Sequence, residues 1–183
     1  MLKWLARRQL DAFEQAFDYD VTYMREMLDT SWRGFRLFAP VAKMVAHRED
    51  VPLETWYAAK IVAFVAEDCG PCTQLVVTMA EREGVSQSVL RAILAGDERA
   101  MGENAALGVR FARAVLAHDP QADELREQIV QRWGERAVLS LALGIAAARV
   151  FPTVKYALGH GKTCSRVRVG NTETRPAAIA APA

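Results

Sequence analysis

The sequence predicts a single all-α domain, and three observations lead to this prediction. Apolar residues recur three and four positions apart along nearly the whole 183-residue chain, which is the spacing of helices with one buried face. No segment longer than a few residues shows the strict alternation of a half-buried strand. With 51% hydrophobic and 25% charged residues, the chain can form one core and remain in solution. We expect this domain to span residues 1–170, followed by a flexible tail over 171–183 that lacks periodicity.

The first third of the chain predicts three helices. The first two span about Leu2–Phe17 and Val21–Leu28 and are separated by acidic residues that are typical of helix caps. A third helical segment runs from about Ser31 to His47. Because a proline interrupts helical hydrogen bonding, Pro40 must kink or divide this segment.

The middle of the chain places two cysteines between two helices. The helix Leu53–Ala66 must end near Gly70, since glycine and proline follow one another there. Pro71 has a preset φ and needs no backbone N–H, so it is well suited to open a new helix that extends to about Glu83. Cys69 and Cys72 are therefore expected at or within the first turn of that second helix.

The rest of the chain predicts further helices and no membrane span. The longest apolar stretch without charge has about a dozen residues, whereas crossing a bilayer takes roughly 20. We therefore expect it to form a buried core helix. The remaining helices are expected over about Ser86–Leu94, Gly102–Ala117, Pro120–Trp133, the apolar run after Arg136, and a separate short segment from Pro152 to Leu158.

Charge and the N-terminal sequence limit the possible partners. The 23 Lys and Arg nearly balance the 22 Asp and Glu, so no net field attracts nucleic acid or an anionic membrane surface. We expect binding to neither. The N-terminal segment is interrupted by charge every few residues and has no continuous apolar region of a signal peptide. We therefore expect a cytoplasmic protein.

The cysteine count favours redox chemistry over a structural disulfide framework. Three cysteines are an odd number, and the expected location is reducing. A thiol reacts as its thiolate, which the N-terminus of a helix stabilises through unpaired N–H groups and a partial positive charge. Two thiols three positions apart can also reach disulfide geometry, so one can attack a substrate while the other resolves the product.

Cys69-Gly70-Pro71-Cys72 is identical to the active-site tetrapeptide of thioredoxins, but a thioredoxin motif follows a buried strand, and here a helix precedes it. A cysteine pair between two helices instead resembles the alkylhydroperoxidase AhpD and carboxymuconolactone decarboxylase superfamily, over about Pro52–Ala117. The resemblance implies an AhpD-like helical bundle, a homo-oligomer, and reduction of peroxides by the cysteine pair without a further cofactor. It also implies that Cys72 meets the peroxide and Cys69 resolves, whereas the helix dipole favours Cys69 as the attacking thiol in disulfide exchange.

The proton relay of the family does not carry over to this chain. Peroxidase members have a histidine four residues after the second cysteine and a glutamate about a dozen residues before the first, and these positions hold Val76 and Tyr57 here. Glu67 is the best local candidate for a proton acceptor, since it lies two residues before the pair. His160, flanked by two glycines, is the second candidate for the missing base.

We therefore expect a thiol-dependent oxidoreductase that cycles between dithiol and disulfide while reducing a peroxide or a disulfide, with an unidentified thiol as reductant. One alternative is a redox-responsive helical oligomer or binding module without catalysis. A second is a structural zinc site formed by Cys69, Cys72, His160 and Cys164, whose residue types and local spacing suit zinc. A third is a pair of inert buried thiols. The presence of the pair makes the decarboxylase branch of the superfamily an unfavoured interpretation.

Overall fold

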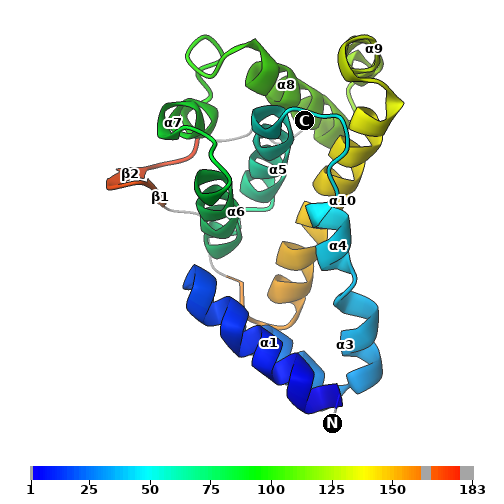
Figure 1. The fold of residues 1–183 in the computed structure, drawn as a ribbon, viewed down its shortest axis with the longest axis vertical. Coiled ribbons are helices and arrows are strands. Elements are labelled where there is room, and N and C mark those ends of the chain that lie inside the picture. The colour runs from blue at the N-terminus through cyan, green and yellow to red at the C-terminus, as the bar shows by residue number, and fades with distance from the viewer. Residues whose placement is uncertain (1, 162–165, 178–183) are drawn as a thin grey trace.

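The computed structural model describes residues 2–161 and 166–177. Helices account for 73% of these residues, which confirms the predicted all-α class (Figure 1). The segment 31–47 is divided at Pro40, as expected. The described helices are α1 (Leu2–Phe17), α2 (Thr22–Thr30), α3 (Trp32–Phe38), α4 (Val41–Ala46), α5 (Leu53–Ala66), α6 (Gly70–Arg82), α7 (Gln87–Ala95), α8 (Glu103–Ala117), α9 (Gln121–Trp133) and α10 (Glu135–Ala157).

Helix α5 forms the centre of the fold. Every residue from 55 to 64 is buried, as expected for a helix that is apolar on all sides. It packs against α6, α8 and α10. Its approach to α8 is closest at Gly108, where an added Cβ would lie 2.4 Å from the carbonyl oxygen of Thr55. Glycine at this position therefore sets the distance between the two central helices.

The buried apolar residues form two clusters. The larger one contains residues of α5 to α10, and the smaller one contains residues of α1 to α3 and the segment between α1 and α2. Phe151 on α10 packs against both clusters. Figure 1 shows α1 lying across the end of the molecule, beside the C-terminal half of α10. The N-terminal helices thus attach to the main bundle through α10 and also through α6, where Leu75 packs against the smaller cluster and Arg82 donates to the carbonyl oxygen of Ala16.

Helix α10 differs from the sequence prediction. It runs without a break from Glu135 to Ala157 and contains Pro152, which was expected to begin a separate helix. Proline removes one helical hydrogen bond, but packing on both sides keeps the helix continuous, since Ala148 and Lys155 are both buried. By length and composition α10 could cross a membrane, although 44% of its most apolar 18-residue stretch is buried inside the fold.

A short β-hairpin follows α10 and was not predicted. Strands β1 (Val167–Val169) and β2 (Thr172–Thr174) pair antiparallel. Both valines of β1 are fully buried in the main cluster, so the expectation of a core without strands is wrong at this point. Strands of three residues are too short to show an alternating pattern. Beyond β2, the N–H of Ala177 donates to the carbonyl of Leu94 at 2.7 Å, which ties the described part of 171–183 to α7.

Candidate functional site

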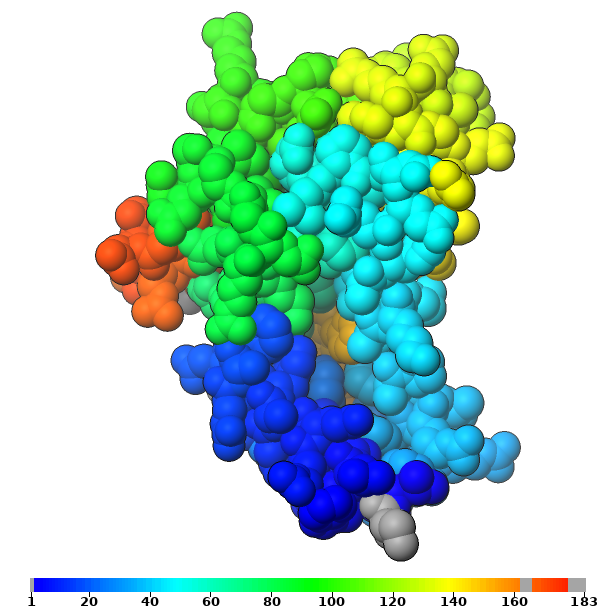
Figure 2. Space-filling model, viewed as in Figure 1, coloured from blue at the N-terminus to red at the C-terminus, as the bar shows by residue number. Residues whose placement is uncertain are grey.

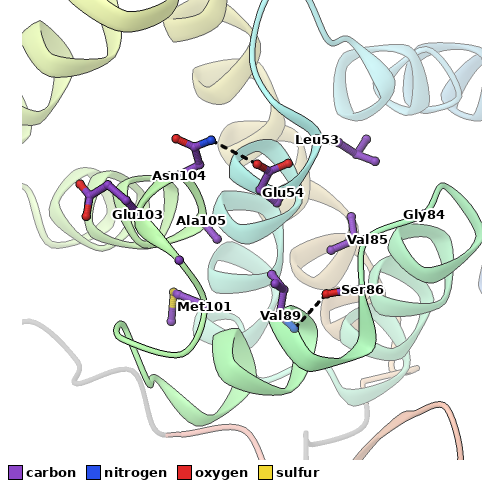
Figure 3. A pocket seen from close by; sticks show the side chains of 11 residues that line it. Leu53, Glu54, Gly84, Val85, Ser86, Val89, Met101, Glu103, Asn104 and Ala105 are labelled. Carbon is purple, nitrogen blue, oxygen red and sulfur yellow. Dashed lines mark hydrogen bonds between the residues drawn. The ribbon is translucent and has the colours of Figure 1, made fainter.

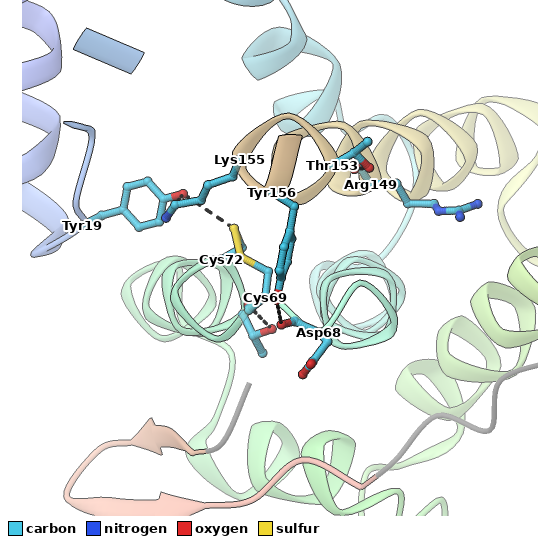
Figure 4. Close-up of a disulfide and its surroundings, with 9 residues drawn as sticks. Tyr19, Asp68, Cys69, Cys72, Arg149, Thr153, Lys155 and Tyr156 are labelled. Atoms are coloured by element: carbon cyan, nitrogen blue, oxygen red, sulfur yellow. Dashed lines mark hydrogen bonds between the residues drawn. A yellow bond between two sulfur atoms is a disulfide. The ribbon is translucent and has the colours of Figure 1, made fainter. Parts of the chain in front are cut away.

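The candidate site lies at the start of α6, where the cysteine pair forms a disulfide. Asp68 adopts a left-handed backbone conformation with φ of 49° and separates α5 from α6. Cys69 is the N-cap of α6, and Pro71 occupies its first turn. Cys69 and Cys72 are bonded through their sulfurs with their Cα atoms 5.3 Å apart (Figure 4).

Hydrogen bonds from two helices hold the backbone of this turn. The hydroxyl of Thr73 donates to the carbonyl oxygen of Cys69 at 3.0 Å, and the hydroxyl of Tyr156 on α10 donates to the carbonyl oxygen of Asp68 at 3.1 Å. The Cys69 carbonyl oxygen also accepts the backbone N–H of Thr73 at 2.9 Å, so Thr73 holds it through two hydrogen bonds. The position of the disulfide is therefore fixed from both α6 and α10.

The two sulfurs have different surroundings. Both cysteines are buried, but Cys72 lines a cavity of about 710 Å³ and Cys69 does not. Figure 2 shows the molecule hollowed between α1, α4 and α6, with atoms of α10 visible behind the opening. A cavity of this volume is within the range of about 300–1,000 Å³ that is typical of small-molecule sites. Its apolar lining includes Phe13, Phe35, Phe38, Phe64, Leu75 and Phe151.

Tyr19 and Lys155 extend a polar chain from the sulfur of Cys72. The Tyr19 hydroxyl lies 3.6 Å from Cys72 Sγ, and Lys155 Nζ lies 3.4 Å from the same hydroxyl. All three residues are buried, and both side chains point toward Cys72 in Figure 4. Burial raises the pKa of Tyr19 to about 12. The phenol therefore remains protonated at neutral pH and can donate a proton or a hydrogen bond beside the sulfur.

The structure places the candidate bases from the sequence outside the cavity lining. Glu67 pairs with Arg149 Nε at 2.6 Å, and the Arg149 side chain points away from the disulfide in Figure 4. His160 Nε2 lies 2.7 Å from a carboxylate oxygen of Glu26 on α2. Glu67 is therefore paired with a basic residue, and His160 with an acidic one. Cys164, a member of the zinc alternative, lies outside the described residues, and no group of three or more metal ligands occurs among those described.

Sequence reasoning missed Tyr19 and Lys155. Tyr19 lies 53 positions from Cys72, in the short segment between α1 and α2, and Lys155 lies on the last helix. Only their buried state distinguishes them from other polar residues, and neither has a sequence motif. A lysine within the apolar face of α10 was the one available signal, because lysine is rarely buried without a partner.

The two positions that differ from the AhpD pattern both face the cavity. Val76 and Tyr57 line it, and the Tyr57 hydroxyl donates to Glu83 Oε1 at 2.7 Å. Burial, followed by the hydrogen bond to the carboxylate, raises the pKa of Tyr57. Lys60, one turn further along α5, also lines the cavity. The cavity lining therefore contains polar side chains, Tyr57 and Lys60, in addition to Cys72.

A second pocket, of about 410 Å³, lies among α5, α7 and the start of α8 (Figure 3). The side chain of Asn104 donates to Glu54 across it at 3.2 Å, and Met101 is the sulfur-bearing residue in its lining. No cysteine, histidine or lysine lines this pocket among the described residues. The redox pair therefore assigns the candidate site to the larger cavity.

Comparisons of this chain with protein-family models, curated proteins and solved structures find no match.

Proposed function

We propose that this protein is a thiol peroxidase with an AhpD-like helical bundle, which reduces small apolar hydroperoxides. The observation that carries the proposal is that Cys72, one half of the Cys69–Cys72 disulfide, lines the 710 Å³ apolar cavity with the Tyr19 hydroxyl 3.6 Å from its sulfur. This arrangement combines a redox centre, a space for an apolar substrate and a proton donor.

The burial of the pair favours a small substrate over a protein disulfide. Cys69 is 0% exposed and Cys72 is 2% exposed, so a sulfur on another protein cannot reach either atom without opening the fold. A small hydroperoxide can approach Cys72 through the cavity. The same geometry favours Cys72 over Cys69 as the attacking thiol, in agreement with the resemblance and against the dipole argument.

The first step consumes the peroxide. The Cys72 thiolate attacks the terminal oxygen of ROOH, so that an S–O bond forms, the O–O bond breaks and RO⁻ leaves. The leaving alkoxide takes the proton of the Tyr19 hydroxyl and departs as ROH. Cys72 is thereby oxidised by two electrons to a sulfenic acid. The start of α6 stabilises the thiolate before attack, because its unpaired N–H groups carry partial positive charge.

The second step closes the disulfide. The thiol of Cys69 attacks the Cys72 sulfur, the S–S bond forms, and the hydroxyl group leaves as water with the Cys69 proton. Tyr19 recovers the proton that Cys72 released when it became a thiolate. A small dithiol then reduces the disulfide by exchange and becomes a disulfide itself. Each cycle converts one ROOH and one dithiol into ROH, water and an oxidised dithiol.

In this proposal Tyr19 takes the part that the histidine and glutamate play in the AhpD family. A buried phenol can protonate the leaving alkoxide, which is a stronger base than the phenolate. Lys155, 3.4 Å from the phenol oxygen, stabilises the phenolate that remains. A reducing location such as the cytoplasm, predicted from the sequence, supplies the small thiols that this cycle needs.

The test is consumption of cumene hydroperoxide with dithiothreitol as reductant. We expect turnover by the wild-type protein, loss of turnover in Cys72→Ser, and formation of a sulfenic acid without turnover in Cys69→Ser, detected with dimedone. Wild-type activity in Cys72→Ser would contradict the assignment of the attacking thiol. A wild-type protein that forms the disulfide reversibly but consumes no peroxide would instead support the redox-responsive module.

A further inference from the structure

Lys60 is a buried cation of the cavity that the peroxide chemistry does not use. Its side chain is 3% exposed and lines the same cavity as Cys72. No salt bridge or hydrogen bond to its Nζ occurs among the described residues. An ammonium group without a carboxylate partner is rarely buried, because leaving water is unfavourable for the charge.

The packing around Lys60 holds the ammonium group in place. Nζ lies 3.5 Å from the centroid of the Trp56 ring and 4.6 Å from that of the Tyr57 ring, and both rings line the cavity. On the other side, a Cβ at Gly144 of α10 would lie 3.3 Å from Lys60 Cγ. The lysine stem is thus confined between α10 and two aromatic faces, which attract a cation.

The other charges of the cavity leave a positive excess. Arg48 and Glu83 are the remaining charged residues in its described lining. Glu83 accepts a hydrogen bond from Tyr57, and Arg48 donates to the carbonyl oxygen of Val51. With Lys60 protonated, the cavity contains two cations and one carboxylate and can accept one anionic group without a net negative charge.

We propose that the cavity binds amphipathic carboxylates, with the carboxylate beside Lys60 and the apolar body along the phenylalanine lining, and that the hydroperoxide substrate belongs to this class. The assignment of the substrate rests on the proposed function, whereas the binding of a carboxylate does not. A carboxylate at this position would pair directly with the buried ammonium, which Glu83 influences only through its charge and not through a hydrogen bond. Transfer of the apolar body from water into a cavity lined by aromatic rings contributes favourably to the free energy of binding.

The binding test uses decanoate, with the neutral decan-1-ol as its matched probe, and the disulfide form of the protein in isothermal titration calorimetry. Burial lowers the pKa of Lys60 to about 7, against the opposing effect of Glu83. We therefore expect decanoate to bind at least about tenfold more tightly at pH 6.5 than at pH 8.5, and decan-1-ol to bind equally at both. Decanoate binding that does not depend on pH, or that is no tighter than decan-1-ol binding at pH 6.5, would overturn the proposal.

Two variants separate the charge from the fold. Lys60→Met keeps a stem of similar length and removes the ammonium, and should weaken decanoate binding at pH 6.5 by about tenfold or more while leaving decan-1-ol binding unchanged. Lys43→Met, at an exposed position of α4 outside the cavity lining, should bind decanoate as the wild type does. Equal decanoate affinity in the wild type and Lys60→Met would also overturn the proposal, and the pH series in the wild type tests it without any variant.

Turnover then separates this inference from the proposed function. A fatty-acid hydroperoxide should have a KM about tenfold lower than cumene hydroperoxide, and Lys60→Met should remove this difference. If the KM of the fatty-acid hydroperoxide is the same in the wild type and in Lys60→Met, the substrate assignment fails while the peroxidase function stands. Lys60-dependent decanoate binding without turnover of either peroxide would defeat the peroxidase function while the carboxylate site stands.

Discussion

The hydroxyl of Tyr19 lies 3.6 Å from the sulfur of Cys72, although the two residues are 53 positions apart in the chain. The contact joins the segment between α1 and α2 to the first turn of α6. It places a protonated phenol beside the sulfur of the disulfide that faces the cavity. The role of Tyr19 can be separated from its packing, since phenylalanine keeps the ring and removes the hydroxyl.

Tyr19→Phe should lower kcat for cumene hydroperoxide by about 100-fold, because loss of a general acid removes roughly 10²–10⁴ in rate. The disulfide should still form, since neither sulfur is altered. Steady-state peroxide consumption with dithiothreitol measures the rate, and far-UV circular dichroism verifies that the helical content is unchanged.

The controls for Tyr19 are the bases that the sequence suggested. Glu67 pairs with Arg149 and His160 pairs with Glu26, so Glu67→Gln and His160→Gln should each retain kcat within about twofold. A large loss of kcat in either variant, together with normal activity in Tyr19→Phe, would return the proton relay to the residues that the sequence suggested.

The disulfide between Cys69 and Cys72 should form reversibly without Cys164. The two bonded residues lie within one helical turn, at a Cα distance of 5.3 Å. In Cys164→Ser, titration with Ellman's reagent should therefore count two free thiols after reduction and none after mild oxidation. In the wild-type protein, which retains Cys164, cysteines that stay reduced under mild oxidant together with one equivalent of bound zinc would favour the metal alternative.

Lys60 should make stability depend on pH. Its pKa falls from 10.5 in the unfolded chain to about 7 in the fold, mainly through burial. Between these values the unfolded state binds more protons than the native state, so this residue makes the free energy of unfolding rise as pH increases from 7 to 10.5. Below pH 7 the penalty of burying the charge is fully present.

Removing this charge should therefore stabilise the fold at low pH. In urea unfolding of the disulfide form at pH 6, the free energy of unfolding of Lys60→Met should exceed that of the wild type by on the order of a few kcal/mol. This difference should shrink by pH 9.5. Lys43→Met, with its exposed side chain, should follow the wild type at both pH values. A constant difference between Lys60→Met and the wild type would contradict the assigned pKa.

Gly108→Ala should destabilise the protein by about 1–3 kcal/mol, because its Cβ would meet the Thr55 backbone at 2.4 Å and force α5 and α8 apart. At Gly144 the nearest atom to an added Cβ is Lys60 Cγ at 3.3 Å, so the side chain there need shift by only a few tenths of an ångström. Gly144→Ala should therefore change stability by less than about 1 kcal/mol, since alanine also improves helix propensity. Thermal denaturation compares the two, and equal effects would contradict the close approach at Gly108.

The protein should self-associate, as the sequence resemblance implies. Leu2, Trp4 and Leu5 on α1 are large apolar residues with 65%, 56% and 47% exposure, and Leu37 on α3 is 76% exposed. Sedimentation velocity at micromolar concentrations should show an oligomer, and Trp4→Ser should shift it toward the monomer. A wild-type monomer throughout this range would refute the prediction.

The sequence by itself determined the helical class, most helix boundaries and the position of the cysteine pair. These features depend on residues close together in the chain: the spacing of apolar side chains, the interruption at Pro40, and the opening of α6 by Gly70 and Pro71. Pro152 shows the limit of this local reasoning, because packing on both sides of the proline keeps α10 continuous. The buried valines of β1 show the same limit for a strand of three residues.

Only the tertiary structure decided what surrounds the thiols. Tyr19, Lys60 and Lys155 come from three separate parts of the chain, and each is set apart by burial, which follows from how those parts pack together. The sequence suggested Glu67 first and His160 second as bases, but the fold gives each a partner of its own, Arg149 and Glu26. Local spacing can predict a helix and a disulfide, whereas the depth of a cavity and the partner of a charge depend on contacts between residues far apart in the chain.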